Sequence, residues 1–309
     1  MGDGIIAGLH PHVAATLNHF PLILNLNDLP VFAAMPDSAR LDLPAYLERI
    51  AYRGELLPSL SLLQALHLAH ATHIPFENLD VLQGRAIRLD LAGLQAKLVA
   101  GGRGGYCFEQ NLLFQAALET LGFAVLPLAA RVRYRSQRIL PRTHMLLLVE
   151  SDGGRWLCDV GFGAEGLLLP VPFGTAEEVR HFAWRYRIVA DGGQWLLQSW
   201  QQTPEPGWQD LYAFTLEAQH LADFEMANHY VSTHPDSRFV QTLTVQLPTP
   251  EGRHVLRNRE LTFDRGASVE RRLLADDEEL LMVLEGTFGL RFAPGTRFRY
   301  HDEAPQRPE

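Results

Sequence analysis

The spacing of apolar residues changes near Phe123, and this change limits the chain to a fold in which helices and strands are segregated. From Leu41 to Phe123 the apolar residues recur at helical spacing, which predicts helices that begin near Asp42, Leu60 and Cys107. Beyond Phe123 the spacing falls to about two residues, which is typical of strands. We therefore expect a small helical bundle followed by a sheet.

The predicted strands are separated by turn-like breaks, which indicates an antiparallel sheet or barrel. Two of the breaks, Asp152-Gly153-Gly154 and Asp191-Gly192-Gly193, are typical of hairpins. The strands are expected at residues 124–134, 143–149, 155–160, 182–190 and 194–200.

The last part of the chain is predicted to form a third, mixed unit. Residues 216–230 are helix-like, and a strand is expected at 242–247. A late helix from Asp276 to Leu284 starts with acidic residues, which favour a helix N-terminus, and Gly286 is expected to end it.

Composition argues against several classes of function. The net charge of −9 disfavours a nucleic-acid surface built on positive charge, and the apolar runs are too short to span a membrane. Lys97 is the one lysine among 27 basic residues, so lysine Schiff-base chemistry is set aside. Two cysteines, Cys107 and Cys158, are too few for a disulfide framework and are typical of a reducing compartment.

The first 35 residues differ from the rest of the chain. They contain no lysine or arginine, and the apolar stretch from Phe20 to Ala34 is interrupted by Pro21 and Pro30, so a secretory signal is not indicated. We therefore predict a cytoplasmic protein with a leader extension outside the core. A start at Met35 and a native leader both remain open.

Cys107 stands where a glycine-rich segment, Arg103-Gly104-Gly105-Tyr106, is expected to become a helix. Unpaired amides and the helix dipole at such a position stabilise a thiolate, and the amides are candidate oxyanion donors. A packed, inert cysteine is the alternative.

A base and an acid interrupt two apolar strands. His144 breaks the run 143–149, and Asp159 breaks 155–160. If the turn between them forms a hairpin, the carboxylate and the imidazole come within reach of each other, and a thiolate nucleophile needs such a pair. A core histidine with a separate turn-capping aspartate remains the alternative.

The segment from Arg103 to Asn111 resembles the R-G-G-x-C-x-E-x-N signature of the arylamine N-acetyltransferases. His144 and Asp159 fall in segments similar to the triad histidine and the D-x-G-x-G strand of that family. Residues 66–80 resemble the stretch before the catalytic loop, and 228–239 resemble the S-T-x-P-x-S stretch. The four motifs occur in the family's order, and the likeness extends over residues 41–292, nearly the whole chain after the leader.

The resemblance implies an α+β fold with an N-terminal helical bundle, a central antiparallel β-barrel and a C-terminal α/β lid. The core would carry a Cys-His-Asp arrangement like that of cysteine proteases and transglutaminases. The implied units are a leader at residues 1–35, the bundle at 36–121, the barrel at 122–213, an interdomain helix at 214–234, the lid at 235–301 and a tail at 302–309.

The implied activity is ping-pong transfer of an acetyl group from acetyl-CoA, without a metal, to an arylamine, arylhydrazine or N-hydroxyarylamine. Cys107 would carry the acetyl group as a thioester, His144 would move the proton, and Asp159 would fix the histidine tautomer. The implied acceptor walls are Phe76, Tyr106 and Phe214. The implied coenzyme site comprises Gly161, Gly163, Ser232, Thr233 and Ser237.

Three further features of the sequence bear on metal and coenzyme binding. His67, His70 and His73 sweep around a helix without a completing carboxylate, which disfavours a metal site. The arginines between Arg131 and Arg142 are assigned to a solvated face rather than to coenzyme phosphates. Glu165 departs from expectation, because it adds negative charge to a loop expected near those phosphates.

Three rival functions remain from the sequence. One is an amide synthase that takes its acyl group from a carrier protein and closes a polyketide chain onto an aromatic amine. Another is a Cys-His-Asp hydrolase or peptidase, because the same triad cleaves peptide bonds. Acetylation of Cys107 by acetyl-CoA separates the amide synthase from the first hypothesis, and release of peptide fragments would support the peptidase. The third rival is a non-enzymatic binding module, for which Cys107→Ala would leave the activity unchanged in every assay.

Overall fold

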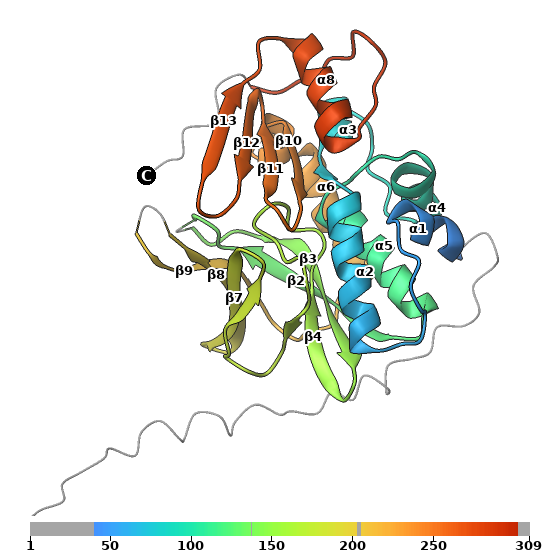
Figure 1. Cartoon of the computed structure of the whole chain (residues 1–309), viewed down its shortest axis with the longest axis vertical. Helices are drawn as coiled ribbons and strands as arrows, with labels where there is room; N and C mark the ends of the chain where they lie inside the picture. The colour runs from blue at the N-terminus through green and yellow to red at the C-terminus, as the bar shows by residue number, and fades with distance from the viewer. Residues whose placement is uncertain (1–39, 137, 203–204, 302–309) are drawn as a thin grey trace, which may run out of the picture.

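The computed structural model describes residues 40–136, 138–202 and 205–301. The expected leader at 1–35 and the expected tail at 302–309 lie outside these residues. Two antiparallel sheets and a group of helices make up the described part of the chain (Figure 1).

The first region is helical, as the apolar spacing predicts. Its elements are α1 (Leu43–Arg49), α2 (Leu60–His73), β1 (Phe76–Glu77), α3 (Leu79–Leu82), α4 (Leu91–Leu94), the π-helical η3 (Gln95–Ala100) and α5 (Cys107–Thr120). The side chains of Asp42 and Ser59 accept hydrogen bonds from amides of the first turn and so cap α1 and α2. The three predicted helix starts are confirmed.

The second region forms an eight-stranded antiparallel sheet. Its strands are β2 (Ala124–Val132), β3 (Arg142–Ser151), β4 (Gly154–Cys158), β5 (Val171–Pro172), β6 (Val179–His181), β7 (Trp184–Asp191), β8 (Gln194–Gln201) and β9 (Gly207–Phe214), in the order β5-β4-β3-β2-β9-β8-β7-β6. The edge strand β5 contacts β7, so the sheet is nearly closed. Asp152 and Gly153 adopt positive φ in the predicted β3–β4 hairpin turn.

The third region is mixed, as predicted. It comprises α6 (Leu221–Thr233), α7 (Arg238–Gln241), β10 (Thr244–Pro248), β11 (Arg253–Arg257), β12 (Glu260–Asp264), β13 (Val269–Leu273) and α8 (Asp277–Phe288). The smaller sheet runs in the order β1-β10-β11-β12-β13, so it takes its first strand from the helical region. This crossing strand also bridges to Gly105, so it ties the loop before Cys107 to the last region.

The predicted end of the late helix at Gly286 is wrong. The helix α8 continues through Gly286 to Phe288 and ends at Gly289, whose φ of 69° is left-handed. A glycine inside a helix costs about 1 kcal/mol, and the buried Leu280, Val283 and Phe288 offset this cost.

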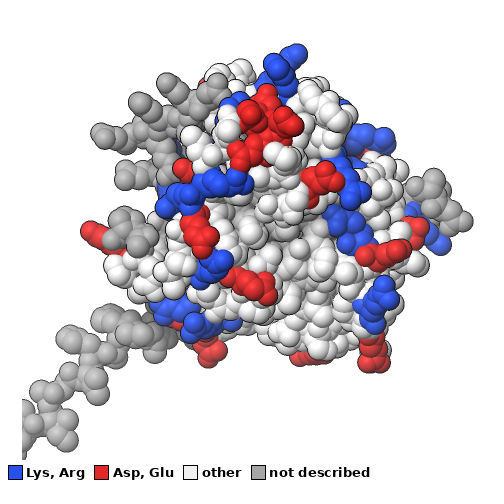
Figure 2. Space-filling view, turned by 45° about the horizontal axis from the view of Figure 1, so that its top comes forward, with Lys and Arg blue, Asp and Glu red and all other residues white. Residues whose placement is uncertain are grey.

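The helices α2 and α5 lie against the larger sheet, and the smaller sheet lies beside them with α8 (Figure 1). The core between them includes Leu66, Phe114, Met145 and Leu147. On the face in Figure 2, acidic and basic side chains are interspersed. Among the described residues, the helices fall short of the length and hydrophobicity that a membrane span requires.

Candidate active site

Cys107 begins α5 and is 4% exposed. The preceding loop packs tightly on β1, where Glu77 donates its amide to the carbonyl of Gly105 over 3.0 Å. A Cβ on Gly104 would overlap the carbonyl oxygen of Pro75, so this position requires glycine. The loop therefore fixes the entry into the helix and the place of the sulfur.

His144 and Asp159 are in direct contact. Nε2 of His144 lies 2.7 Å from Oδ2 of Asp159, and both side chains are buried. His144 stands on β3 opposite Ala130, and Asp159 follows the last residue of β4. The hairpin thus places the two buried polar side chains in hydrogen-bonding contact.

The electrostatics favour an imidazolium beside a carboxylate. Burial opposes protonation of the ring, but the charge and hydrogen bond of Asp159, together with Cys107, raise the pKa of His144 above its ordinary value. Burial also acts to raise the pKa of Asp159, but His144 and the hydrogen bonds from Asn111 and Gly161 hold it below its ordinary value.

Cys107 adjoins this pair. Its thiol donates to the carbonyl of Thr143 over 3.6 Å, and the sulfur is close enough to the His144 ring to contribute to its raised pKa. Because Asp159 occupies Nε2, Nδ1 is the ring nitrogen left to face the sulfur. The geometry can therefore pass a proton from the thiol to a carboxylate-oriented imidazole.

Asn111 links the helix to the pair and was not predicted as a site residue. Its amide nitrogen donates to Oδ1 of Asp159 over 3.0 Å and to the carbonyl of Met145 over 2.8 Å. Its amide oxygen accepts from the nitrogen of Val160 over 3.2 Å. The sequence signal was present, because Asn111 closes the glycine-cysteine motif.

The three predicted acceptor residues lie in different surroundings. Phe76 and Tyr106 share a partner in Phe239, at ring distances of 5.8 and 5.6 Å. Phe214 lies in the interior of the larger sheet, where its ring contacts Phe173.

Two rings pack on His144: Phe162, with 5.0 Å between centroids, and Tyr212, with 4.9 Å. Neither Phe162 nor Phe239 was predicted as a site residue. Both are distant from Cys107 in the sequence, and no local pattern indicates their placement.

The predicted coenzyme residues fall into two groups. Gly161 lies against Cys107, since a Cβ there would stand 2.8 Å from the Cys107 Cα, and Gly163 packs on the side chain of Gln246. The hydroxyls of the other three bond helix carbonyls: Ser232 to Asn228, Thr233 to His229 and Ser237 to Val231.

Glu165 does not carry an uncompensated charge. Its Oε2 lies 3.1 Å from Nη1 of Arg253, and its Oε1 accepts from the hydroxyl of Tyr134 over 3.0 Å. The buried guanidinium of Arg253 also donates to the hydroxyl of Tyr186 over 2.5 Å. The negative charge that the sequence places in this loop is therefore neutralised from β11.

The histidines considered as metal ligands have other roles. His67 accepts a hydrogen bond at Nε2 from the amide of Asp159 over 3.1 Å. His70 donates from Nε2 to Gln110 over 2.7 Å and accepts at Nδ1 from the hydroxyl of Tyr46 over 2.9 Å. Burial lowers the pKa of His67 to about 4 and that of His70 to about 3. Within the described ranges, three or more potential ligands do not gather around a metal-sized site.

The neutral state of His70 predicts a pH dependence of stability. Between its ordinary pKa of 6.5 and its folded-state pKa of about 3, the unfolded chain binds a proton at His70 and the folded chain does not. The free energy of unfolding should therefore fall by about 1.4 kcal/mol per pH unit from this residue as the pH drops below 6.5. The measurement is the free energy of unfolding in urea as a function of pH, for the parent and for His70→Gln. Below pH 6.5 this free energy should change less steeply with pH in the variant. Parallel curves above that pH serve as the control, and equal slopes below it would contradict the prediction.

A model of the N-acetyltransferase family matches residues 59–296. The arylamine N-acetyltransferase of Escherichia coli K12 is 39% identical over 248 residues, which cover 79% of this chain and 87% of that protein. A solved Nocardia farcinica arylamine N-acetyltransferase is 41% identical, with a TM-score of 0.78 over 83% of this chain and 92% of that one. The chain belongs to the arylamine N-acetyltransferase family. Membership confirms the predicted family and makes the chain an acyltransferase.

Another structural relative was solved with a ligand. The Mycobacterium marinum arylamine N-acetyltransferase, solved in complex with CoA, is 35% identical, with a TM-score of 0.76. It covers 80% of this chain, and 92% of its own length is matched.

Proposed function

We propose that this arylamine N-acetyltransferase moves an acetyl group from acetyl-CoA to an arylamine, arylhydrazine or N-hydroxyarylamine through a thioester on Cys107. The observation that carries the proposal is the convergence of Cys107, His144 and Asp159, which are far apart in the sequence. The CoA complex of the M. marinum relative supports the donor, and the name of the Salmonella typhimurium relative includes N-hydroxyarylamine O-acetyltransferase.

In the first half-reaction the proton of the Cys107 thiol passes to Nδ1 of His144, where Asp159 stabilises the resulting imidazolium, and the thiolate attacks the acetyl carbonyl. The bond between the carbonyl carbon and the coenzyme sulfur breaks, and His144 returns the proton to the leaving thiolate. Asp159 holds Nε2 throughout, so the ring keeps the tautomer that accepts at Nδ1. Amides at the start of α5 are the candidate donors to the oxyanion.

In the second half-reaction the amine nitrogen attacks the thioester. The new carbon–nitrogen bond forms, the carbon–sulfur bond to Cys107 breaks, and the amine proton passes through His144 to the sulfur. Phe76 and Tyr106 remain the proposed aromatic contacts for the ring of the acceptor. Phe239, which contacts both, and Phe162, which packs on His144, are added to them. Phe214 stays a prediction.

The proposed coenzyme-binding residues differ in the structural support that each has. Gly161 and Gly163 are supported by their loop, which begins against Cys107 and whose charge Arg253 neutralises. Ser232, Thr233 and Ser237 stay predictions, because their hydroxyls are engaged by helix carbonyls. The domain boundaries are also retained, with β1 as the strand that crosses them.

Incubation with acetyl-CoA and no acceptor should acetylate Cys107, as read by intact mass and peptide mapping, and an aniline should then discharge the label. Cys158→Ala is the matched control, because Cys158 is a second buried cysteine, and it should label normally. Cys107→Ala should not label. An intact Cys107 thiol after incubation would favour the carrier-dependent amide synthase instead, and acetate release without transfer would favour the hydrolase.

A further inference from the structure

Glu109 holds the residue that precedes Cys107. It is the third residue of α5, and its Oε2 reaches back to accept the amide hydrogen of Tyr106 over 3.1 Å. A Cβ on Gly105 would lie 2.6 Å from this oxygen, so the carboxylate lies directly beneath the loop. The Glu109 carboxylate therefore sets the backbone at the start of the helix that presents the thiol.

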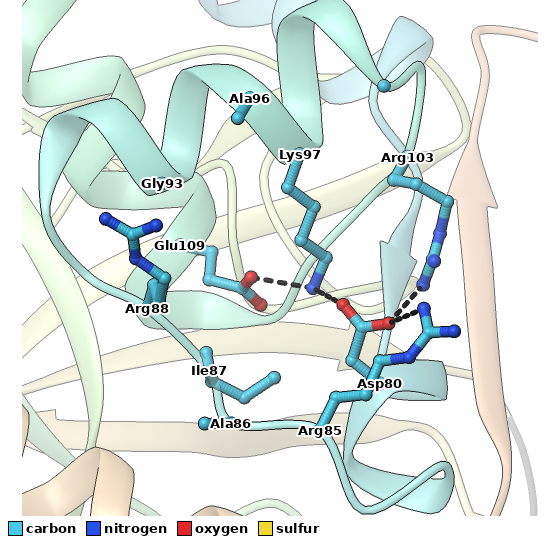
Figure 3. A pocket seen from close by; sticks show the side chains of 11 residues that line it. Asp80, Arg85, Ala86, Ile87, Arg88, Gly93, Ala96, Lys97, Arg103 and Glu109 are labelled. Carbon is cyan, nitrogen blue, oxygen red and sulfur yellow. Dashed lines mark hydrogen bonds and ion pairs between the residues drawn. The ribbon is translucent and has the colours of Figure 1, made fainter.

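Lys97 meets the other oxygen of this carboxylate (Figure 3). Its Nζ lies 2.7 Å from Oε1 of Glu109 and 2.9 Å from Oδ2 of Asp80. The neighbouring cation Arg103 is engaged elsewhere, with Glu77 at 2.6 Å and Asp80 at 3.2 Å. Lys97 is thus the cation that meets Glu109 beneath the Cys107 loop.

The backbone around Lys97 supports the same loop. Lys97 lies in the π-helical segment η3, where the amide of Gly101 donates to the carbonyl of Ala96. The carbonyl of Lys97 accepts from the amide of Arg103 over 3.1 Å. Both the main chain and the side chain of Lys97 therefore contact the segment that leads to Cys107.

A buried carboxylate needs a partner cation to stay ionised, and at Glu109 the effect of burial and the effect of Lys97 oppose each other. Burial raises the pKa of Glu109 to about 7, although the charge and hydrogen bond of Lys97 oppose this shift. Burial also opposes the charge on Lys97, but Glu109, Glu77 and Asp80 raise its pKa above the ordinary value. Without the ammonium, Glu109 would take up a proton and become a weaker acceptor for the Tyr106 amide.

We propose that Lys97 is a positioning residue for Cys107: through Glu109 it holds the Tyr106–Cys107 backbone so that the sulfur stays aligned with His144. The inference rests on the proposed role of Cys107 in acetyl transfer. Its test reads the reactivity of the thiol itself, which does not depend on any acyl donor.

The test is a double-mutant cycle on the rate of alkylation of Cys107 by iodoacetamide, followed by peptide mapping. Lys97→Ala should slow alkylation about tenfold, because a misplaced thiol loses its contact with His144. In a Glu109→Gln background the same change should have little further effect, because a neutral amide oxygen still accepts from Tyr106 and needs no cation. Thermal unfolding of each variant separates reactivity from stability.

The cavity in front of Lys97 permits a rescue experiment. It has a volume of about 360 Å³, and its lining includes Lys97, Glu109, Asp80, Arg85 and Ile87. Propylammonium replaces the atoms that Lys97→Ala removes and should restore most of the alkylation rate. Tetramethylammonium, which has no N–H to donate to the carboxylate, should not. Arg88→Ala is the matched control, because Arg88 lines the cavity but pairs with Asp90, and it should alkylate at the parent rate.

Three results would overturn the inference. They are a parent-like rate for Lys97→Ala, an equal loss in the Glu109→Gln background, and no response of Lys97→Ala to propylammonium. If Lys97→Ala does not fold, Lys97→Gln, which keeps N–H donors without the charge, takes its place in the cycle. Failure of Cys107 to accept an acetyl group would instead contradict the proposed function and leave the alkylation result standing.

Discussion

Asp159→Asn is expected to lower kcat/KM for acetyl transfer by about 10³–10⁴-fold while the protein stays folded. The asparagine oxygen can still accept from Asn111 and Gly161, which bond Oδ1 of the carboxylate. Its amide nitrogen then faces Nε2 of His144, where the carboxylate oxygen stood 2.7 Å away. The ring must accept at Nε2 and carry its proton at Nδ1, so it can no longer take the proton of Cys107.

The measurement is coenzyme A release with an aniline as acceptor, together with the thermal midpoint of each variant. Asp210→Asn is the matched control, because Asp210 lies on β9 and pairs with Arg133 at 3.4 Å, away from the pair of His144 and Asp159. It should keep nearly full activity. A loss of less than tenfold in Asp159→Asn would show that the tautomer of His144 is not what the reaction needs.

The pair of His144 and Asp159 could be anticipated because each interrupts an apolar strand and a hairpin turn joins the two strands. The place of Cys107 could be anticipated because two glycines precede a helical pattern. In both cases the signal is local. Strand alternation and the helix start carry it, and tertiary packing only brings the parts together.

The aromatic surroundings could not be read in the same way. Phe239 reaches Phe76 and Tyr106 because α7 packs against α3 and α6, and nothing near residue 239 in the sequence specifies that packing. The strand β1 is two residues long and pairs with β10 from the last region, so it has no periodicity to detect. The π-helical segment with Lys97 escapes prediction for a different reason, because it continues α4 without a break in the helical pattern.

Gly161→Ala is expected to lower kcat/KM about 100-fold and to reduce the free energy of unfolding by about 1–3 kcal/mol. A Cβ at this position would stand 2.8 Å from Cα and 2.9 Å from the carbonyl oxygen of Cys107, and 2.7 Å from Nδ2 of Asn111. Two of these atoms belong to the backbone of α5 and cannot rotate away. The loop after Asp159 must therefore move back, and the carboxylate that its amide bonds moves with it.

The control for this change is Gly286→Ala. Gly286 lies inside α8, a Cβ there would meet no atom within 4 Å, and alanine is the better helix former. Gly286→Ala should leave the activity unchanged, and its midpoint of urea unfolding should equal or exceed that of the parent. Because the φ of Gly161 is outside the left-handed region, any penalty at residue 161 comes from the contact with Cys107 and not from backbone strain. Full activity in Gly161→Ala would mean that the loop can withdraw without disturbing His144 and Asp159, and the close packing of this loop on the cysteine would then not be required for acetyl transfer.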